Sequence, residues 1–184
     1  MSTMNTLICK EPKKLVWKER EIPIPGESEA LIKIKSVGIC GTDIHAWGGN
    51  QPFFSYPRVL GHEICGEIVG LGKNIQNLKN GQQVAVIPYV ACQQCPACLS
   101  GRTNCCEKIS VIGVHQDGGF SEYLSVPVTN LLDAQGIDPQ AAALIAETAA
   151  RLGGLDILVN NAGITRDGLL VRLSAAQFGE VLAT

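Results

Sequence analysis

The sequence predicts a mainly β domain over residues 1–138, followed by an incomplete α/β fragment over residues 139–184. Two observations predict the β domain. Several segments alternate apolar and polar side chains with a period of two, and many glycines separate them without regular crossover helices. Strands of such uneven length suggest a distorted antiparallel barrel. The fragment is predicted by an alanine-rich helical stretch followed by a short apolar run.

The expected strands share the alternation that half-buried strands show. They are Lys13–Lys18, Ala30–Val37, Glu63–Leu71, Gln82–Ile87 and Phe120–Val126. Asn80-Gly81 marks a tight turn before the fourth strand. Gly70-Leu71-Gly72 ends the third strand, and we expect a plain turn there because no phosphate-cradling G-x-G-x-x-G pattern continues from it.

The second half begins with helix signals. Asp138 is placed as an N-cap with Pro139 at the first helical position, and the helix is expected to reach Leu152 before Gly153-Gly154. Leu155–Val159 suits a strand buried on both faces of a parallel sheet. Ser174 and Gln177 form a capping box for a last helix. A single α/β unit of this kind cannot bury its own faces.

Length and charge restrict the class of protein. The 184 residues suffice for one domain of ordinary size or for one domain plus a fragment. The net charge is −2 and no basic stripe is present, so nucleic acid and anionic membranes are not expected partners. The first residues lack the layout of a secretory signal, and apolar runs such as Ala141–Ala146 are too short to span a membrane. We therefore expect a soluble, cytoplasmic protein.

Four of the eight cysteines follow the pattern C-x2-C-x2-C-x7-C. They are Cys92, Cys95, Cys98 and Cys106. Four thiolates on a short loop can surround a zinc ion in a closed tetrahedron, which would stabilise the loop without performing chemistry. An iron–sulfur cluster is the first alternative, although its fourth cysteine is usually closer and followed by proline, whereas Glu107 follows here. Disulfides or plainly buried thiols are the second, and Cys105 could replace Cys106 on spacing alone.

A second group of metal-ligand residues is spread more widely. Cys40 follows a predicted strand, and His62 and Glu63 open another strand about twenty residues later. A thiolate, an imidazole and a carboxylate suit a catalytic zinc with an open coordination position. Each residue alone is more often explained by core packing or a hydrogen bond. The cysteine loop that follows makes the joint pattern much more specific.

Together these motifs resemble the medium-chain zinc alcohol dehydrogenases, within the sorbitol and threonine dehydrogenase-like group and nearest its sugar-acid branch. The likeness covers roughly residues 5–145. It is carried by Gly38–His45, by Gly61-His62-Glu63 with Gly66, by the cysteine loop, and by Gly118–Tyr123. The resemblance implies a GroES-like barrel that holds both zinc ions. It also implies a small-molecule alcohol or sugar-acid substrate, an NAD(P) cofactor and a homo-oligomeric state.

The resemblance also implies roles for single residues. Cys40 and His62 would bind the catalytic zinc, and Glu63 would be an exchangeable ligand or a neighbour of the ligands. Thr42 would pass a proton from the alcohol to His45 and then to solvent, while zinc acts as a Lewis acid for hydride transfer. Thr42 could equally be a helix N-cap, a role that is compatible with the relay.

The sequence departs from the family near residue 146. A further glutamate ligand is expected where Ala146 stands, and Glu147 comes one place later. One residue rotates a helical side chain by about 100°, so Glu147 is expected to point away from the metal. The sequence also has no glycine-rich dinucleotide turn between a strand and a helix.

The last segment resembles a different family. Gly153–Gly163 and Ile164–Leu170 are similar to short-chain dehydrogenases of the 3-oxoacyl-carrier-protein reductase type. The Tyr-x-x-x-Lys pair of that family is missing because Tyr123 is the last tyrosine. We therefore expect a chimera joined within Pro139–Glu147 and impaired as an enzyme. The alternatives are a non-catalytic zinc-binding fragment, or a reductase-like protein defined by the tail.

Overall fold

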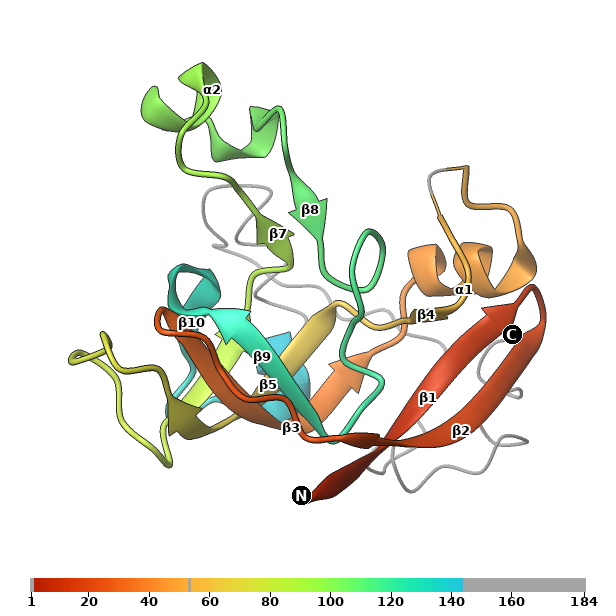
Figure 1. Ribbon diagram of the computed structural model, residues 1–184, viewed down its shortest axis with the longest axis horizontal. Coiled ribbons are helices and arrows are strands. Elements are labelled where there is room, and N and C mark those ends of the chain that lie inside the picture. Colours follow the sequence, from red (N-terminus) through yellow and green to blue (C-terminus); the bar gives the residue numbers. More distant parts are fainter. Residues whose placement is uncertain (1, 53, 144–184) are drawn as a thin grey trace.

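The computed structural model describes residues 2–52 and 54–143, which form a three-stranded sheet, a five-stranded sheet and a projecting lobe that contains a two-stranded sheet (Figure 1). The mainly β class is confirmed for this part of the chain. Several predicted features lie outside the described residues. They are most of the helix expected to end at Leu152, the glutamate Glu147, the strand Leu155–Val159, the helix from Ser174 and the segment that resembles short-chain dehydrogenases.

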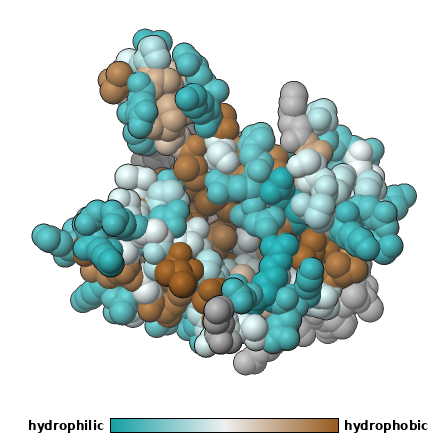
Figure 2. All heavy atoms as spheres, in the orientation of Figure 1, coloured by the Kyte–Doolittle hydropathy of each residue, from teal (hydrophilic) through white to brown (hydrophobic). Residues whose placement is uncertain are grey.

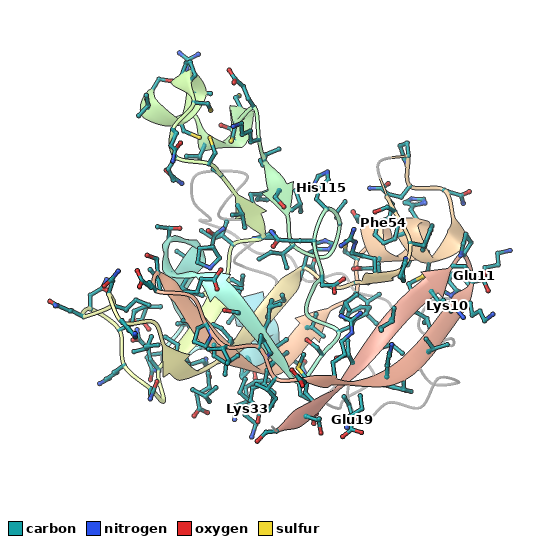
Figure 3. The ribbon with its side chains drawn as sticks, viewed as in Figure 1. Lys10, Glu11, Glu19, Lys33, Phe54 and His115 are labelled. Carbon is teal, nitrogen blue, oxygen red and sulfur yellow. The ribbon has the colours of Figure 1, made fainter. Side chains whose placement is uncertain are left out.

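A three-stranded sheet contains the start of the chain. Its order is β2 (Lys14–Glu21), β1 (Thr3–Glu11), β4 (Arg58–Val59). The inner face of β1 is buried, while the labelled charged side chains of Lys10, Glu11 and Glu19 point away from the body (Figure 3). Among the described residues β2 is an edge strand, and it is rich in charged residues, which disfavours edge-to-edge pairing with another chain.

The larger sheet has five strands in the order β10-β6-β5-β3-β9. The strands are β3 (Glu29–Gly38), β5 (Glu63–Leu71), β6 (Gln83–Val86), β9 (Tyr123–Pro127) and β10 (Leu131–Asp133). One core forms against this sheet from the fully buried side chains of Ile32, Ile64, Ile68, Val84, Val86 and Val126. The central pair β3–β5 carries the residues of the candidate site at one end, where Gly38 lies opposite Glu63.

Several predicted boundaries are confirmed. β5 has the predicted bounds, and the turn at Asn80-Gly81 is present, with Gly81 at φ +85° and the Gln82 N–H donating to the Lys79 carbonyl at 3.3 Å. Asp138 caps the next helix, because its Oδ1 accepts from the backbone N–H groups of Gln140 (2.9 Å) and Ala141 (3.2 Å).

Several strands differ from the prediction. β2 continues to Glu21, and β4, β10 and two short strands at residues 89–90 and 110–111 had no predicted counterpart. β1 had no predicted counterpart, because four consecutive residues, 6–9, are buried and the alternation of a half-buried strand is lost. The strand expected from Phe120 begins only at Tyr123. The backbone of residues 118–120 pairs instead with residues 59–61, which are the last residue of β4 and the first two residues of the loop before β5.

The remaining elements frame the two sites. α1 (Gly41–Gly48) follows β3 and lies beside the three-stranded sheet, with the labelled Phe54 close to it (Figure 3). Residues 89–111, named here the cysteine lobe, project from the body (Figure 1). The lobe contains β7 (Tyr89–Val90), α2 (Pro96–Leu99), the 3-10 helix η1 (Thr103–Cys105) and β8 (Ser110–Val111); a second 3-10 helix, η2 (Val128–Asn130), precedes β10. Apolar atoms gather between the lobe and the body (Figure 2).

Among the described residues, no helix has the length and apolar character needed to cross a bilayer.

Candidate metal centres

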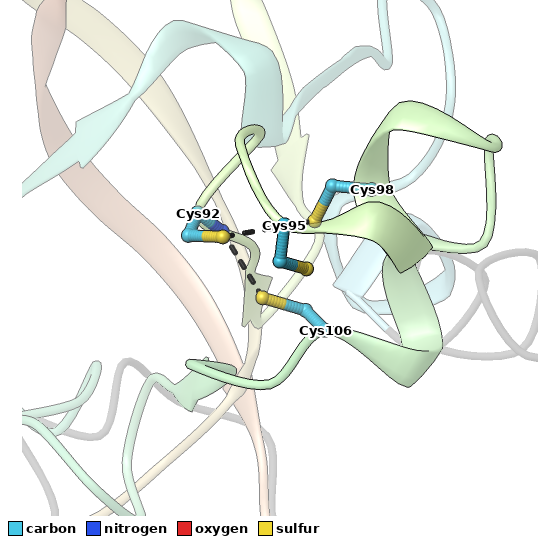
Figure 4. Close-up of side chains that lie close together, drawn as sticks. All are labelled: Cys92, Cys95, Cys98 and Cys106. Atoms are coloured by element: carbon cyan, nitrogen blue, oxygen red, sulfur yellow. Dashed lines mark hydrogen bonds between the residues drawn. The ribbon is translucent and has the colours of Figure 1, made fainter.

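Four cysteine side chains converge in the cysteine lobe (Figure 4). Cys92 follows β7, Cys95 is the N-cap of α2, Cys98 lies within α2, and Cys106 follows η1. Their sulfur atoms all lie within 4.8 Å of one another, and three of the four side chains are buried. The spacing seen in the sequence therefore brings together the four predicted ligands.

The sulfur geometry fits a single zinc ion. The Sγ atoms of Cys92 and Cys98 are 3.9 Å apart, and a tetrahedron with Zn–S bonds of about 2.3 Å places sulfurs about 3.8 Å apart. A multi-iron cluster would hold the sulfurs further apart, since its cysteines bind different iron atoms. All four thiols are free of disulfide bonds. Cys105 is exposed and outside the group, so the geometry favours Cys106 as the fourth ligand.

Backbone N–H groups of the lobe point at these sulfurs. The N–H groups of Cys92 and Lys108 donate to the Cys106 Sγ, each at 3.3 Å. Similar bonds from the N–H groups of Cys98 and Glu107 lower the pKa of Cys95 to about 6. Burial instead raises the pKa of Cys98 to about 12. Donors directed at sulfur stabilise thiolates, which are the form that binds a metal.

A second group is formed by Cys40, His62 and Glu63, whose ligand atoms lie within 4.8 Å of one another. The Cys40 Sγ is 3.0 Å from the His62 Nε2. A tetrahedral zinc would separate these two atoms by about 3.6 Å. An increase of about half an ångström in the distance between Sγ and Nε2 would therefore make room for the ion. His62 and Glu63 are 4% and 9% exposed, respectively. One thiol, one imidazole and one carboxylate in a protected position fit zinc with a free coordination place.

The local backbone explains how Cys40 and Glu63 reach this position. Cys40 is the N-cap of α1 with extended backbone angles (φ −108°, ψ 175°), and its sulfur accepts the Thr42 N–H at 3.3 Å. Burial and the nearby charge of Asp43 raise the pKa of Cys40 to about 11. Gly38 leaves room for Glu63, because a Cβ at residue 38 would collide with the Glu63 carboxylate.

Asp43 is a residue of the site that the sequence reasoning missed. Its carboxylate is 1% exposed; Oδ2 accepts the Cys40 N–H at 3.0 Å, and Oδ1 accepts the Gly61 N–H at 2.9 Å. Oδ1 also lies 3.7 Å from the His62 Nδ1, on the ring edge away from Cys40. Burial raises the pKa of Asp43, while His62 opposes this shift. The capping-box spacing Cys40-x-x-Asp43 was the available signal in the sequence.

Thr42 and His45 lie on α1, which follows Cys40. The interpretation of Thr42 as the helix N-cap is wrong, because the Cys40 side chain takes that position and Thr42 is the second helical residue. His45 is exposed on the next turn. The structure thus groups Cys40, His62 and Glu63 directly, while the proton-relay role of Thr42 and His45 stays a prediction.

Comparisons with known proteins match this geometry. The alcohol dehydrogenase GroES-like domain family matches residues 26–136. The chain is 80% identical to L-galactonate-5-dehydrogenase of Escherichia coli K12 over 172 residues, which is 89% of this chain and 51% of that protein. A match covering 89% of 184 residues necessarily continues beyond residue 145, into the segment expected to be of short-chain type. The chain spans about half the length of the curated relatives it matches.

Solved structures show the same domain. A zinc-binding dehydrogenase from Sinorhizobium meliloti 1021 bound to NADP superposes with a TM-score of 0.73 at 34% identity, covering 79% of this chain and 42% of that one. Galactitol-1-phosphate dehydrogenase from Escherichia coli also gives 0.73, at 33% identity and with coverages of 77% and 41%.

Proposed function

Given that the chain belongs to the zinc-dependent alcohol dehydrogenase family with a GroES-like domain, we propose that it is the catalytic domain of a sugar-acid dehydrogenase. Its reaction is the oxidation of a secondary alcohol with NAD(P). The observation that carries this proposal is the grouping of Cys40, His62 and Glu63 in a protected position, apart from the four-cysteine group. The substrate class follows from the 80% identity to a protein named L-galactonate-5-dehydrogenase.

The two metal groups have different roles in this proposal. Cys92, Cys95, Cys98 and Cys106 hold a structural zinc that stabilises the lobe. Zinc held by Cys40, His62 and Glu63 would supply a Lewis acid that lowers the pKa of a bound alcohol. The Asp43 carboxylate, 3.7 Å from the His62 Nδ1, would orient the imidazole so that Nε2 faces the Cys40 sulfur.

The residues of α1 provide a path for the proton of the substrate hydroxyl. Thr42 and His45 are three positions apart on α1, which places both side chains on one face of the helix. In this proposal the Thr42 hydroxyl accepts the proton and passes it to His45, which is exposed and can exchange it with solvent.

The nicotinamide cofactor requires a binding site. The sequence contains no glycine-rich dinucleotide turn that could form one. We propose that residues 1–184 alone turn over slowly at most. The family activity then requires a nucleotide-binding domain positioned against the described barrel.

The test measures NAD(P)H production by the zinc-loaded chain with L-galactonate, alongside a titration with NADH and NADPH. We expect slow, zinc-dependent turnover that His62→Ala abolishes. Thr42→Val should reduce turnover by about 100-fold through loss of the hydroxyl, whereas the matched Thr42→Ser keeps it. Turnover that survives His62→Ala would contradict the proposed site. Absence of both nucleotide binding and turnover would instead support a non-catalytic zinc-binding role.

A further inference from the structure

The segment that presents His62 is held by a short piece of chain from far along the sequence. Residues 59–61 run from the last residue of β4 into the link to β5, and residues 118–120 lie against them. The N–H groups of residues 118, 119 and 120 donate to the carbonyls of residues 59, 61 and 60 at 2.8, 2.8 and 2.9 Å. This pairing is close-fitting, because a Cβ at Gly118 would collide with the Gly61 carbonyl.

Gly61, the residue directly before His62, is fixed on both sides. Its N–H donates to Asp43, and its carbonyl accepts from Gly119. Its φ of +89° favours glycine, and a Cβ there would lie 2.5 Å from the Phe120 ring. Any shift of residues 118–120 would therefore be transmitted to the backbone that carries the His62 imidazole.

Asp117 joins this piece of chain to the rest of the barrel. Its Oδ1 accepts the Val59 N–H at 3.0 Å and lies 3.7 Å from an Arg58 guanidinium nitrogen. Its Oδ2 accepts from the Arg20 guanidinium on β2 at 2.7 Å. One carboxylate therefore links β2, β4 and the segment that starts at Gly118.

We propose that Asp117 is a positioning residue for His62, acting through the register of residues 118–120 on residues 59–61. The inference rests on the three-ligand metal site of the proposed function. Asp117 contacts Arg20, Arg58 and Val59, which lead to the backbone before His62, so its loss should weaken the three-ligand site and leave the four-cysteine group unchanged. The four-cysteine group lies in the separate lobe and serves as an internal reference in the same molecule.

The test is a zinc titration of the chain labelled with nitrogen-15 histidine, following the imidazole nitrogens by NMR. The chain has only three histidines, His45, His62 and His115, so the His62 signals can be identified by their loss in His62→Gln. Retention of zinc by the cysteine lobe is measured separately, as the metal left after dialysis.

Asp117→Ala should weaken zinc binding at His62 by about tenfold, the lower end of the effect seen when residues supporting metal ligands are changed. Asp117→Asn keeps an oxygen for the Val59 N–H and should fall between wild type and Asp117→Ala. The matched control is Glu67→Gln, which removes a similarly exposed ion pair (Glu67–Lys35, 3.1 Å) from β5 and should change binding less than about twofold.

Equal effects of Asp117→Ala and Glu67→Gln on the His62 signals would overturn the inference, as would an equal loss of zinc from both sites. If Asp117→Ala does not fold, Asp117→Asn decides: weakening beyond the control supports the inference, and none overturns it. If the wild-type His62 signals do not respond to zinc, the proposed metal centre itself is wrong. That result differs from a titration in which the wild type and the variants bind zinc equally well, which would contradict only the role of Asp117.

Discussion

Replacing Asp43 tests how the three-ligand group is held together. The carboxylate accepts one fully buried N–H from Gly61 and one partly buried N–H from Cys40. Asp43→Ala leaves both donors without their acceptor, and a buried group left unpaired costs about 1–3 kcal/mol. Since water can reach the Cys40 N–H in part, we expect a total loss of about 2–4 kcal/mol in the free energy of unfolding. That is a large share of the 5–15 kcal/mol typical of a domain.

The assay is urea unfolding of zinc-stripped protein, because metal binding would otherwise add to the measured stability. Asp43→Asn keeps one acceptor oxygen and places an amide NH2 against the other donor, so its loss should be about 1–3 kcal/mol. Asp133→Ala is the matched control: this exposed aspartate accepts one N–H, from Gln135 at 3.2 Å, and should change stability by less than about 0.5 kcal/mol. If Asp43→Ala were no more destabilising than Asp133→Ala, the role given to the buried carboxylate would be wrong.

Three further predictions concern the cysteines and the base of the lobe. Cys95→Ser should release the zinc of the cysteine lobe and expose the lobe to proteolysis, whereas Cys105→Ser, at an exposed position outside the group, should leave the zinc content unchanged. Burial raises the pKa of Cys9 and Cys65 from 9.0 to about 11. The folded protein therefore keeps thiol protons that the unfolded chain loses, so the free energy of unfolding should fall as the pH rises from 9 to 11. Urea unfolding measured across this pH range should show a smaller fall in the free energy of unfolding for Cys9→Ala than for the wild type. The Asn130 side-chain amide donates to two carbonyl oxygens at the base of the lobe, at 2.8 and 3.0 Å, so Asn130→Ala should lower the urea midpoint by an amount equivalent to about 1–3 kcal/mol, and an unchanged midpoint would contradict this contact.

Local spacing explains why the metal ligands could be predicted from the sequence. Cys92 and Cys106 are only 14 residues apart, so the pattern of the loop nearly determines which sulfurs can meet. The bounds of β5 match the prediction, although its first four residues are all buried and do not alternate. Cys40 and His62 needed the combined motifs, because they come from different elements that meet only in the folded barrel.

The residues that support the ligands depend on distant contacts. Asp43 contacts Gly61, 18 residues away, and Asp117 contacts Val59 and Arg20, 58 and 97 residues away. No periodicity in a single sequence encodes such pairs. The N-cap assigned to Thr42 was wrong for a related reason: threonine is a better general cap than cysteine, but the position of Cys40 after β3 decides where the helix begins.

Zinc analysis of freshly purified, reduced protein tests the central claim most directly. We expect two zinc ions per chain, one that dialysis against a mild chelator removes and one that it leaves. His62→Ala should remove only the first ion, and Cys95→Ser only the second. A wild-type chain that holds no zinc, or a second ion that remains in Cys95→Ser, would contradict the account of both centres.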